Sequence, residues 1–215
     1  MRLGGEIMTR GYPTICYYSR QDEAYLIFAP DLPGCWSDGK TVEDAKKNLS
    51  VIIDEWIECA RQSGQDVPDP LSKLSSTSPS VFDIAKYVLS ETGAISTMML
   101  QKLVYYCQAW ALGWFHQPLF PQRFEAWQKG PVCRELFYSH QGKRIISKAD
   151  IESDHLLSCS EKKLIDNVLT VYKGEDPDWL SELTHSEQPW IQARGTLSDD
   201  RKSNEIIDVS NIETS

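Results

Sequence analysis

Six charged, amide or imidazole side chains of interest lie among large apolar residues in three motifs in the second half of the chain. The motifs are Leu100–Tyr106, Glu125–Val132 and Leu183–Trp190, and the polar residues are Gln101, Lys102, Glu125, Lys129, His185 and Glu187. Charged and amide groups surrounded by apolar residues form either a buried hydrogen-bonded network or a patch that faces a partner. The sequence leaves both interpretations open.

The other parts that an active site needs are not found in the sequence. No nucleophile elbow accompanies the histidines, and there is no glycine-rich phosphate loop. His185-Ser-Glu187 begins like a zinc deaminase motif, but no paired cysteines follow it. The six cysteines include no Cys-x-x-Cys pair and the four histidines are dispersed, so we expect no metal and no cofactor. The sequence therefore predicts a protein that is not an enzyme.

Charge and hydropathy restrict the partners further. The net charge of the 215-residue chain is −9, and the parts before and after Pro70 are both acidic. Neither part has the basic excess that binding to phosphates requires, so autonomous nucleic-acid binding is disfavoured. An acidic protein suits a basic protein partner through long-range attraction. No apolar run approaches the length of a membrane span or a signal peptide, which predicts a cytoplasmic protein without a membrane partner.

The first 66 residues are predicted to form a small α+β domain. The apolar runs Thr14–Tyr18 and Tyr25–Ala29 are typical of strands, and the second is predicted to be buried on both faces. Pro30-Asp-Leu-Pro-Gly34 then forces a turn before a short third strand. Thr41 and Asp44 form a capping box, and apolar residues at helical spacing predict a helix that ends near Gly64.

This region resembles HicB-type antitoxins over residues 12–70, mainly through the string Pro30-Asp-Leu-Pro-Gly-Cys35. The resemblance implies an abbreviated relative of the ribonuclease H fold, with self-association through this domain. Nuclease activity is not expected, because Asp22, Glu23 and Asp31 lie in or beside turns and do not converge on two metals. Asp31 and Trp36 are candidate partner-binding residues here.

The rest of the chain is predicted to be a helical domain over residues 80–215. A segment rich in proline and serine, 67–79, is predicted to link it to the first domain. Helices are expected after Ser80, after Ser96-Thr97, around 160–172, around 177–184 and over 187–194. A further helix is expected to start at Pro131 and to end near Ser139, because proline suits the first helical position.

The three motifs of this second domain look like the Panacea domain of SocA-like antitoxins and related phage-encoded proteins, over residues 80–212. The resemblance implies an inhibitory domain that neutralises toxins of unrelated kinds; one member type delivers its toxin to an ATP-dependent protease. We expect partner contacts at Gln101, Lys102, Tyr105, Glu125, Trp127, Lys129, Gly130, Pro131, His185 and Trp190. For the tryptophans and the Gly130-Pro131 turn, a purely structural role is the alternative.

Together these observations predict an antitoxin of a bacterial or phage toxin–antitoxin system. It would bind its cognate toxin and cover the active site, with the second domain as the main binding surface. Two alternatives stay open. The protein could deliver the toxin to an ATP-dependent protease, or it could repress its own operon, although its charge and the missing basic module oppose DNA binding.

Overall fold

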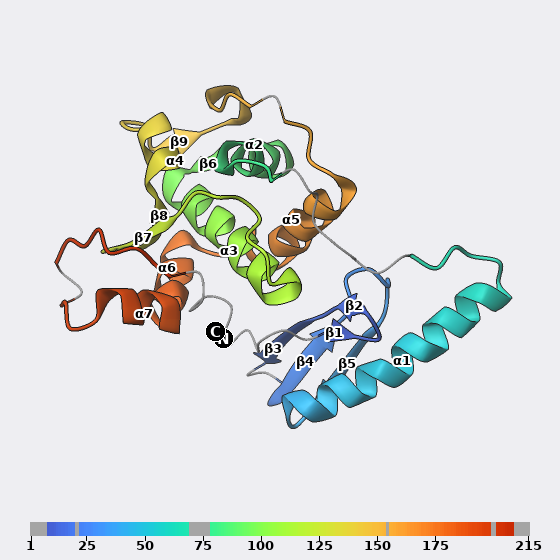
Figure 1. Ribbon diagram of the computed structural model, residues 1–215. Helices are drawn as coiled ribbons and strands as arrows, with labels where there is room; N and C mark the ends of the chain where they lie inside the picture. Colours follow the sequence, from blue (N-terminus) through green and yellow to red (C-terminus); the bar gives the residue numbers. More distant parts are fainter. Residues whose placement is uncertain (1–7, 20–21, 69–77, 154, 199–200, 209–215) are drawn as a thin grey trace. The chain divides into compact units, whose positions relative to one another are not determined.

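The computed structural model describes residues 8–19, 22–68, 78–153, 155–198 and 201–208. It divides into two compact units, Met1–Lys73 and Leu74–Ser215 (Figure 1). The predicted linker 67–79 is described only at its ends, because residues 69–77 lie outside the described part.

Unit 1 is a three-stranded antiparallel sheet packed against one helix. The sheet has the order β3 (Ile15–Ser19), β4 (Ala24–Phe28), β5 (Trp36–Gly39), and the helix is α1 (Val42–Gln62). A short ribbon of β1 (Met8–Thr9) and β2 (Tyr12–Pro13) precedes the sheet. The predicted strands and helix are confirmed, but β4 is not buried on both faces. Leu26 and Phe28 are half-buried because α1 packs on the opposite face, over Ile27.

The turn between β4 and β5 is held by its own backbone and by α1. The amide of Ala29 donates to Cys35 O at 3.0 Å, and the indole of Trp56 donates to Pro33 O at 3.0 Å. At the other end of β5, a Cβ on Gly39 would lie 2.9 Å from Ala45 Cα, so glycine permits the close approach of α1. The capping threonine is in place, since Thr41 Oγ1 accepts from the amide of Asp44 at 3.1 Å.

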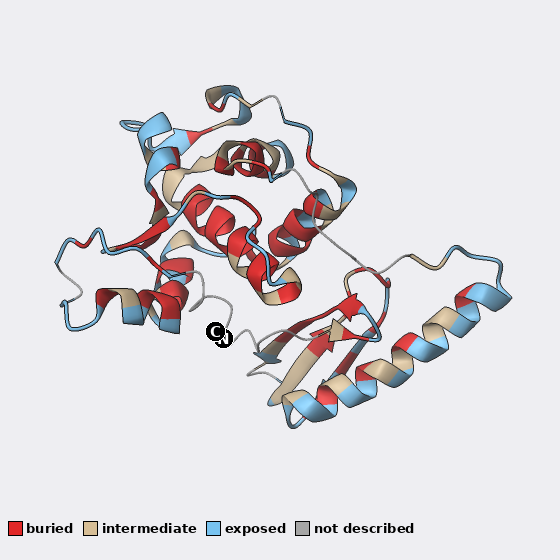
Figure 2. Cartoon of the chain, in the orientation of Figure 1, coloured by how far each residue is buried: buried red, intermediate tan, exposed pale blue. Residues whose placement is uncertain are grey.

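Unit 2 is built around a central helix, α3 (Thr97–Phe115), which is buried along most of its length (Figure 2). An aliphatic and aromatic surface on all sides of a helix requires neighbours on all sides. These neighbours include α2 (Val81–Thr92), α5 (Cys159–Tyr172), α6 (Pro177–His185) and β8 (Gly130–Cys133). The remaining elements are β6 (Ile95–Ser96), β7 (Phe124–Trp127), α4 (Arg134–Ser139), β9 (Ile145–Ile146), a 3-10 turn (Lys148–Asp150) and α7 (Gln188–Arg194). The α+β class is confirmed.

The helix predicted from Pro131 to Ser139 is wrong in its first turn. Pro131 lies in β8, where it is opposite Ala126 of β7, and α4 starts only at Arg134. Proline is tolerated in a two-stranded ribbon because it needs no ladder partner for its nitrogen. The Gly130-Pro131 turn was recognised in the sequence, but nothing in residues 124–127 indicated that they would pair with the residues after that turn.

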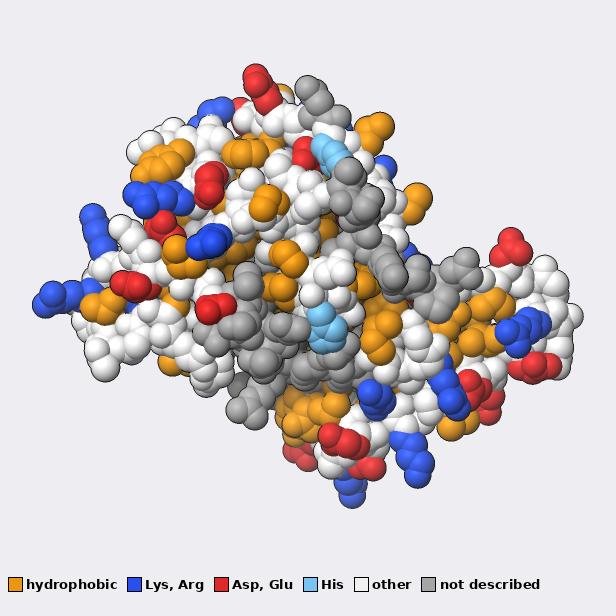
Figure 3. All heavy atoms as spheres, viewed as in Figure 1, with side chains coloured by type: hydrophobic (Ala, Val, Ile, Leu, Met, Phe, Trp, Pro, Cys, Tyr) orange, Lys and Arg blue, Asp and Glu red, His pale blue; other side chains and the backbone are white. Residues whose placement is uncertain are grey.

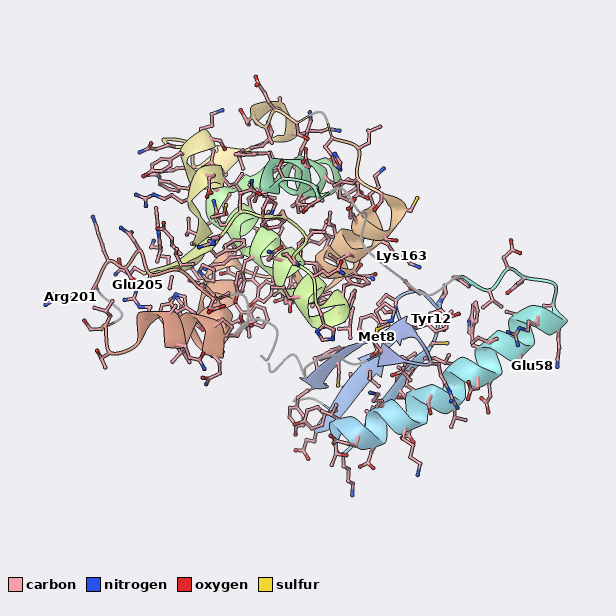
Figure 4. The ribbon with its side chains drawn as sticks, viewed as in Figure 1. Met8, Tyr12, Glu58, Lys163, Arg201 and Glu205 are labelled. Atoms are coloured by element: carbon pink, nitrogen blue, oxygen red, sulfur yellow. The ribbon has the colours of Figure 1, made fainter. Side chains whose placement is uncertain are left out.

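The C-terminal segment adds a backbone connection to the same ribbon. The amide of Ala126 donates to Glu205 O and the amide of Ile207 donates to Phe124 O, each at 2.8 Å. This pairing places residues 202–204 beside the β7–β8 turn. Figure 4 labels Arg201 and Glu205, the exposed residues on either side of this stretch, at the periphery of unit 2.

Charged side chains of both signs are interspersed on the face shown in Figure 3, without a broad field of one sign. This distribution is unlike the continuous basic footprint of a nucleic-acid-binding face. Among the described helices, none is both long enough and apolar enough to cross a membrane.

Candidate functional site

A pocket of about 490 Å³ opens in unit 2 beside the β7–β8 turn. It lies between the first turns of α3, strand β8, helix α4 and residues 202–204. The rings of Trp127 and Phe137, in edge-to-face contact with centroids 4.9 Å apart, form one wall. The buried polar lining consists of Gln101, Lys102, His140 and Ser203. The size and the mixture of aromatic and polar lining are those of a recognition pocket.

Lys102 is the unusual group of this pocket because it is a lysine with only 1% of its surface exposed. Its Nζ donates to the carbonyl oxygen of Lys129 and, at 3.3 Å, to Thr184 Oγ1. Within the described residues, no carboxylate lies within ion-pair distance of this ammonium group. Burial lowers the pKa of Lys102 to about 7, and the charge of Glu187 acts in the opposite direction.

Glu187 is a half-buried acid that contacts α3 one helical turn beyond Lys102. Its Oε1 accepts a hydrogen bond from the hydroxyl of Tyr106 at 3.1 Å, and Tyr106 in turn stacks on Tyr172 with centroids 4.3 Å apart. Burial raises the pKa of Glu187 to about 7, while Tyr106 and Lys102 favour its charged form. Among the described residues of unit 2, an acid and a base therefore have pKa values shifted toward 7 from opposite directions.

This pair predicts a minimum in the stability of unit 2 near pH 7. The pKa of Glu187 is 4.5 in the unfolded chain and about 7 in the native state. Between these pH values the native state binds more protons than the unfolded state, so the free energy of unfolding falls as the pH rises. The pKa of Lys102 is 10.5 in the unfolded chain and about 7 in the native state. Between these pH values the unfolded state binds more protons than the native state, so the free energy of unfolding rises with pH. Each slope should reach about 1 kcal/mol per pH unit.

Urea unfolding followed by tryptophan fluorescence at pH 6, 7 and 8 measures these slopes. The Lys102→Met variant should lose the rise between pH 7 and 8, and Glu187→Gln should lose the fall between pH 6 and 7. A pH profile that both substitutions leave unchanged would show that neither group titrates in this range.

Gly130 makes the position of the Lys102 side chain possible. Its φ of +99° lies in the region that L-residues avoid, and an added Cβ would overlap Lys102 Nζ and lie 2.7 Å from Thr184 Oγ1. The glycine is thus required both for the turn and for the space that the ammonium group occupies.

Gln101 joins α3 to strand β8. Its Oε1 accepts from the amide of Cys133 at 2.8 Å, and its Nε2 donates to Cys133 O at 3.3 Å. The same Nε2 lies 3.4 Å from Nε2 of His140. Gln101 is therefore part of the frame of the pocket as well as its lining.

Glu125 fixes the orientation of the aromatic wall. It is 8% exposed; its Oε2 accepts from the indole of Trp127 at 2.8 Å, and its Oε1 accepts from Nη1 of Arg134 at 3.2 Å. Because a carboxylate held by two donors has little freedom, Trp127 is held in one orientation against the pocket.

The His185–Trp190 motif supports the turn from behind. The two rings stack with centroids 4.1 Å apart, and the indole of Trp190 donates to Trp127 O at 3.0 Å. The guanidinium of Arg194 lies 4.9 Å from the centre of the Trp190 ring and donates to Ala126 O at 3.2 Å. The sequence did not indicate that Arg194 is buried, because its position at the end of a predicted helix is typical of exposed arginines.

The structure brings only some of the expected partner residues to one site. Five of them line the pocket: Gln101, Lys102, Trp127, Lys129 and Pro131. Five others support it or pack behind it: Tyr105, Glu125, Gly130, His185 and Trp190. Asp31 and Trp36 belong to unit 1 and line no part of it; Asp31 is buried in its turn, whereas Trp36 is 61% exposed. Partner binding by any of these residues stays a prediction.

The sequence reasoning also missed Met98, Phe137, His140 and Lys202, which line the pocket. Lys202, four residues before an Ile-Ile pair, had no pattern to distinguish it, because its place depends on the pairing of 205–207 with β7. Among the described residues, there is no group of three or more metal-binding side chains.

Comparison with known families finds two different matches along the chain, the first of which extends beyond unit 1 into α2. Residues 12–87 match the model of the HicB-like antitoxin of bacterial toxin–antitoxin systems, and residues 100–191 match the SocA-like antitoxin, Panacea domain. The chain is a HicB-like antitoxin domain fused to a SocA-like Panacea domain. Over 55 residues the antitoxin is also 31% identical to the UPF0150 protein Ta0767 of Thermoplasma acidophilum. It therefore belongs to the same family as that UPF0150 protein. The match covers 26% of the antitoxin and 80% of the relative. No solved structure matches it.

The Panacea match includes most of the pocket of the antitoxin, from Gln101 to His140, and the supporting motif up to Trp190. Both families consist of antitoxins, which are regulatory partners of toxins and favour a non-enzymatic role. They also imply that the antitoxin has a toxin as its partner.

Proposed function

We propose that this antitoxin binds its cognate toxin directly and blocks the toxin's active site, and that the pocket of unit 2 is the point where the toxin is anchored. The observation that carries the proposal is the aromatic-walled pocket itself. Protein interfaces concentrate their binding energy in a few residues that insert into such pockets. A toxin seated there would bury about 1,200–2,000 Å² in a stable complex.

The geometry supports a preformed site. Trp127 is held by Glu125 and packs on Phe137, and its backbone carbonyl is held by Trp190. Binding to an aromatic wall that is already ordered costs less conformational entropy than binding to a wall that becomes ordered only in the complex. Unit 1 would select the toxin or mediate self-association, with residues 67–79 as the linker, and the complex would form in the cytoplasm.

Expression of the neighbouring open reading frame with this chain tests the proposal. The neighbour should be toxic alone, harmless together with the antitoxin, and should purify with it. The Met98→Trp variant, which fills the pocket from a half-buried position on its rim, should lose at least tenfold in growth rescue. Trp36→Ala, which removes the most exposed aromatic ring of unit 1, tests the competing candidate and should keep rescue.

The opposite pattern, with rescue lost in Trp36→Ala and kept in Met98→Trp, would place the toxin on unit 1. Toxin half-life in cells separates steric inhibition from delivery to a protease. A stable toxin that accumulates in complex with the antitoxin is the expected result, and rapid toxin loss would favour the delivery function.

A further inference from the structure

The charges of the pocket are opposite to those of the chain as a whole. The antitoxin has a net charge of −9, yet the charged residues in the described part of the pocket lining are Lys102, Lys129 and Lys202, and no described aspartate or glutamate lines it. Two of these lysines are exposed at the rim and one is buried. A local reversal of sign in an acidic protein favours an anionic group at this place and repels it elsewhere.

The buried lysine provides a second, independent argument. Nζ of Lys102 has three N–H groups, and within the described residues it donates to two acceptors, Lys129 O and Thr184 Oγ1, both uncharged. An ammonium group that is buried without a carboxylate partner carries a desolvation cost, which a bound anion would offset. The imidazole of His140 lies on the same lining, where it is 3.4 Å from the Gln101 amide.

The apolar wall specifies what must accompany the anion. Trp127, Phe137 and Pro131 face the same cavity, so a free inorganic anion would leave their surfaces in contact with water. A volume of about 490 Å³ accommodates a short peptide segment with one or two side chains. The complementary ligand therefore combines an apolar group with an adjacent carboxylate.

We propose that the pocket receives an acidic side chain of the toxin, an aspartate or a glutamate next to an apolar residue, with the carboxylate directed to the lysines and the apolar residue against Trp127 and Phe137. This inference rests on the proposed function and specifies the chemistry of the anchor. It also accounts for recognition of an acidic anchor by a protein whose overall charge would repel it.

The first test removes two lysine charges at the rim of the pocket, or two elsewhere in unit 2, and measures the Kd of the full-length antitoxin for the purified toxin. The double variant Lys129→Gln/Lys202→Gln should raise the Kd at least tenfold at low salt, and this difference should shrink as salt increases. The control Lys162→Gln/Lys173→Gln changes the net charge equally at exposed positions outside the pocket and should stay within threefold. Equal effects of the two double variants would overturn the proposal.

A second test uses a small probe with the full-length antitoxin alone. 3-Phenylpropionate should shift the indole NMR signal of Trp127, and 3-phenylpropionamide, which has the same shape without the charge, should bind at least tenfold more weakly. Equal binding of acid and amide would overturn the preference for a carboxylate. If Met98→Trp nevertheless abolishes toxin binding, the pocket remains the docking site and only its chemistry is wrong. If Met98→Trp leaves toxin binding intact, the proposed docking site fails and the inference fails with it.

Discussion

The Gly130→Ala variant should lower the free energy of unfolding of unit 2 by about 3 kcal/mol or more. Part of this cost comes from placing an L-residue at a φ of +99°, and the rest from the overlap of the new methyl group with Lys102 Nζ and Thr184 Oγ1. The lysine cannot move without losing its acceptors in a buried environment. Hydrogen exchange of α3 amides, measured by mass spectrometry, reports the loss within unit 2.

Two other glycines of unit 2 separate the two contributions. Gly142 has a φ of +89° and open space around its Cβ position, so Gly142→Ala should show only the backbone cost of about 1–2 kcal/mol. Gly113 lies inside α3 with equally open space, so Gly113→Ala should be neutral or stabilising by up to about 1 kcal/mol. A Gly130→Ala variant no less stable than Gly142→Ala would show that Lys102 does not fill this space.

The Gln101→Met variant should destabilise unit 2 by about 2–4 kcal/mol, because it removes both hydrogen bonds to the Cys133 backbone while keeping the side-chain volume. A buried amide N–H and carbonyl would be left without their present partner, and strand β8 would lose its attachment to α3. Thermal unfolding of the full chain and hydrogen exchange of residues 130–133 measure the effect.

Gln141→Met is the matched control, since it makes the same chemical change at an exposed position between α4 and β9. It should change stability by less than about 0.5 kcal/mol. If Gln101→Met is equally harmless but weakens toxin binding, Gln101 acts on the partner and not on the frame of the pocket.

Local signals were enough to predict most of the elements. The capping residues Thr41 and Ser80 stand where α1 and α2 begin, because a side chain that satisfies free helical amides acts within three residues of itself. The apolar spacing of α1 predicted which stripe packs on the sheet, since that stripe depends only on helical periodicity. The two antitoxin resemblances were also confirmed. They could be found from the sequence because their motifs are contiguous strings.

The errors occurred where pairing partners are distant. Pro131 has the chemistry of a first helical residue, and only its pairing with Ala126 makes it part of a strand. The sequence also carried no information on burial: Tyr105 and Trp190, which were candidates for partner contact, lie inside unit 2, and partner binding by the candidate residues stays a prediction.

The sequence by itself therefore determined the sheet and helix of unit 1, most helices of unit 2, the two antitoxin resemblances and the set of polar residues worth examining, because propensity, capping and motif identity are properties of short segments. Only the tertiary structure decided that Lys102 is buried beneath Gly130 and that 205–207 pairs with β7. It also decided that three lysines share one pocket in an acidic chain. Burial and convergence of charge depend on segments up to about a hundred residues apart, and no local pattern records which of them will meet.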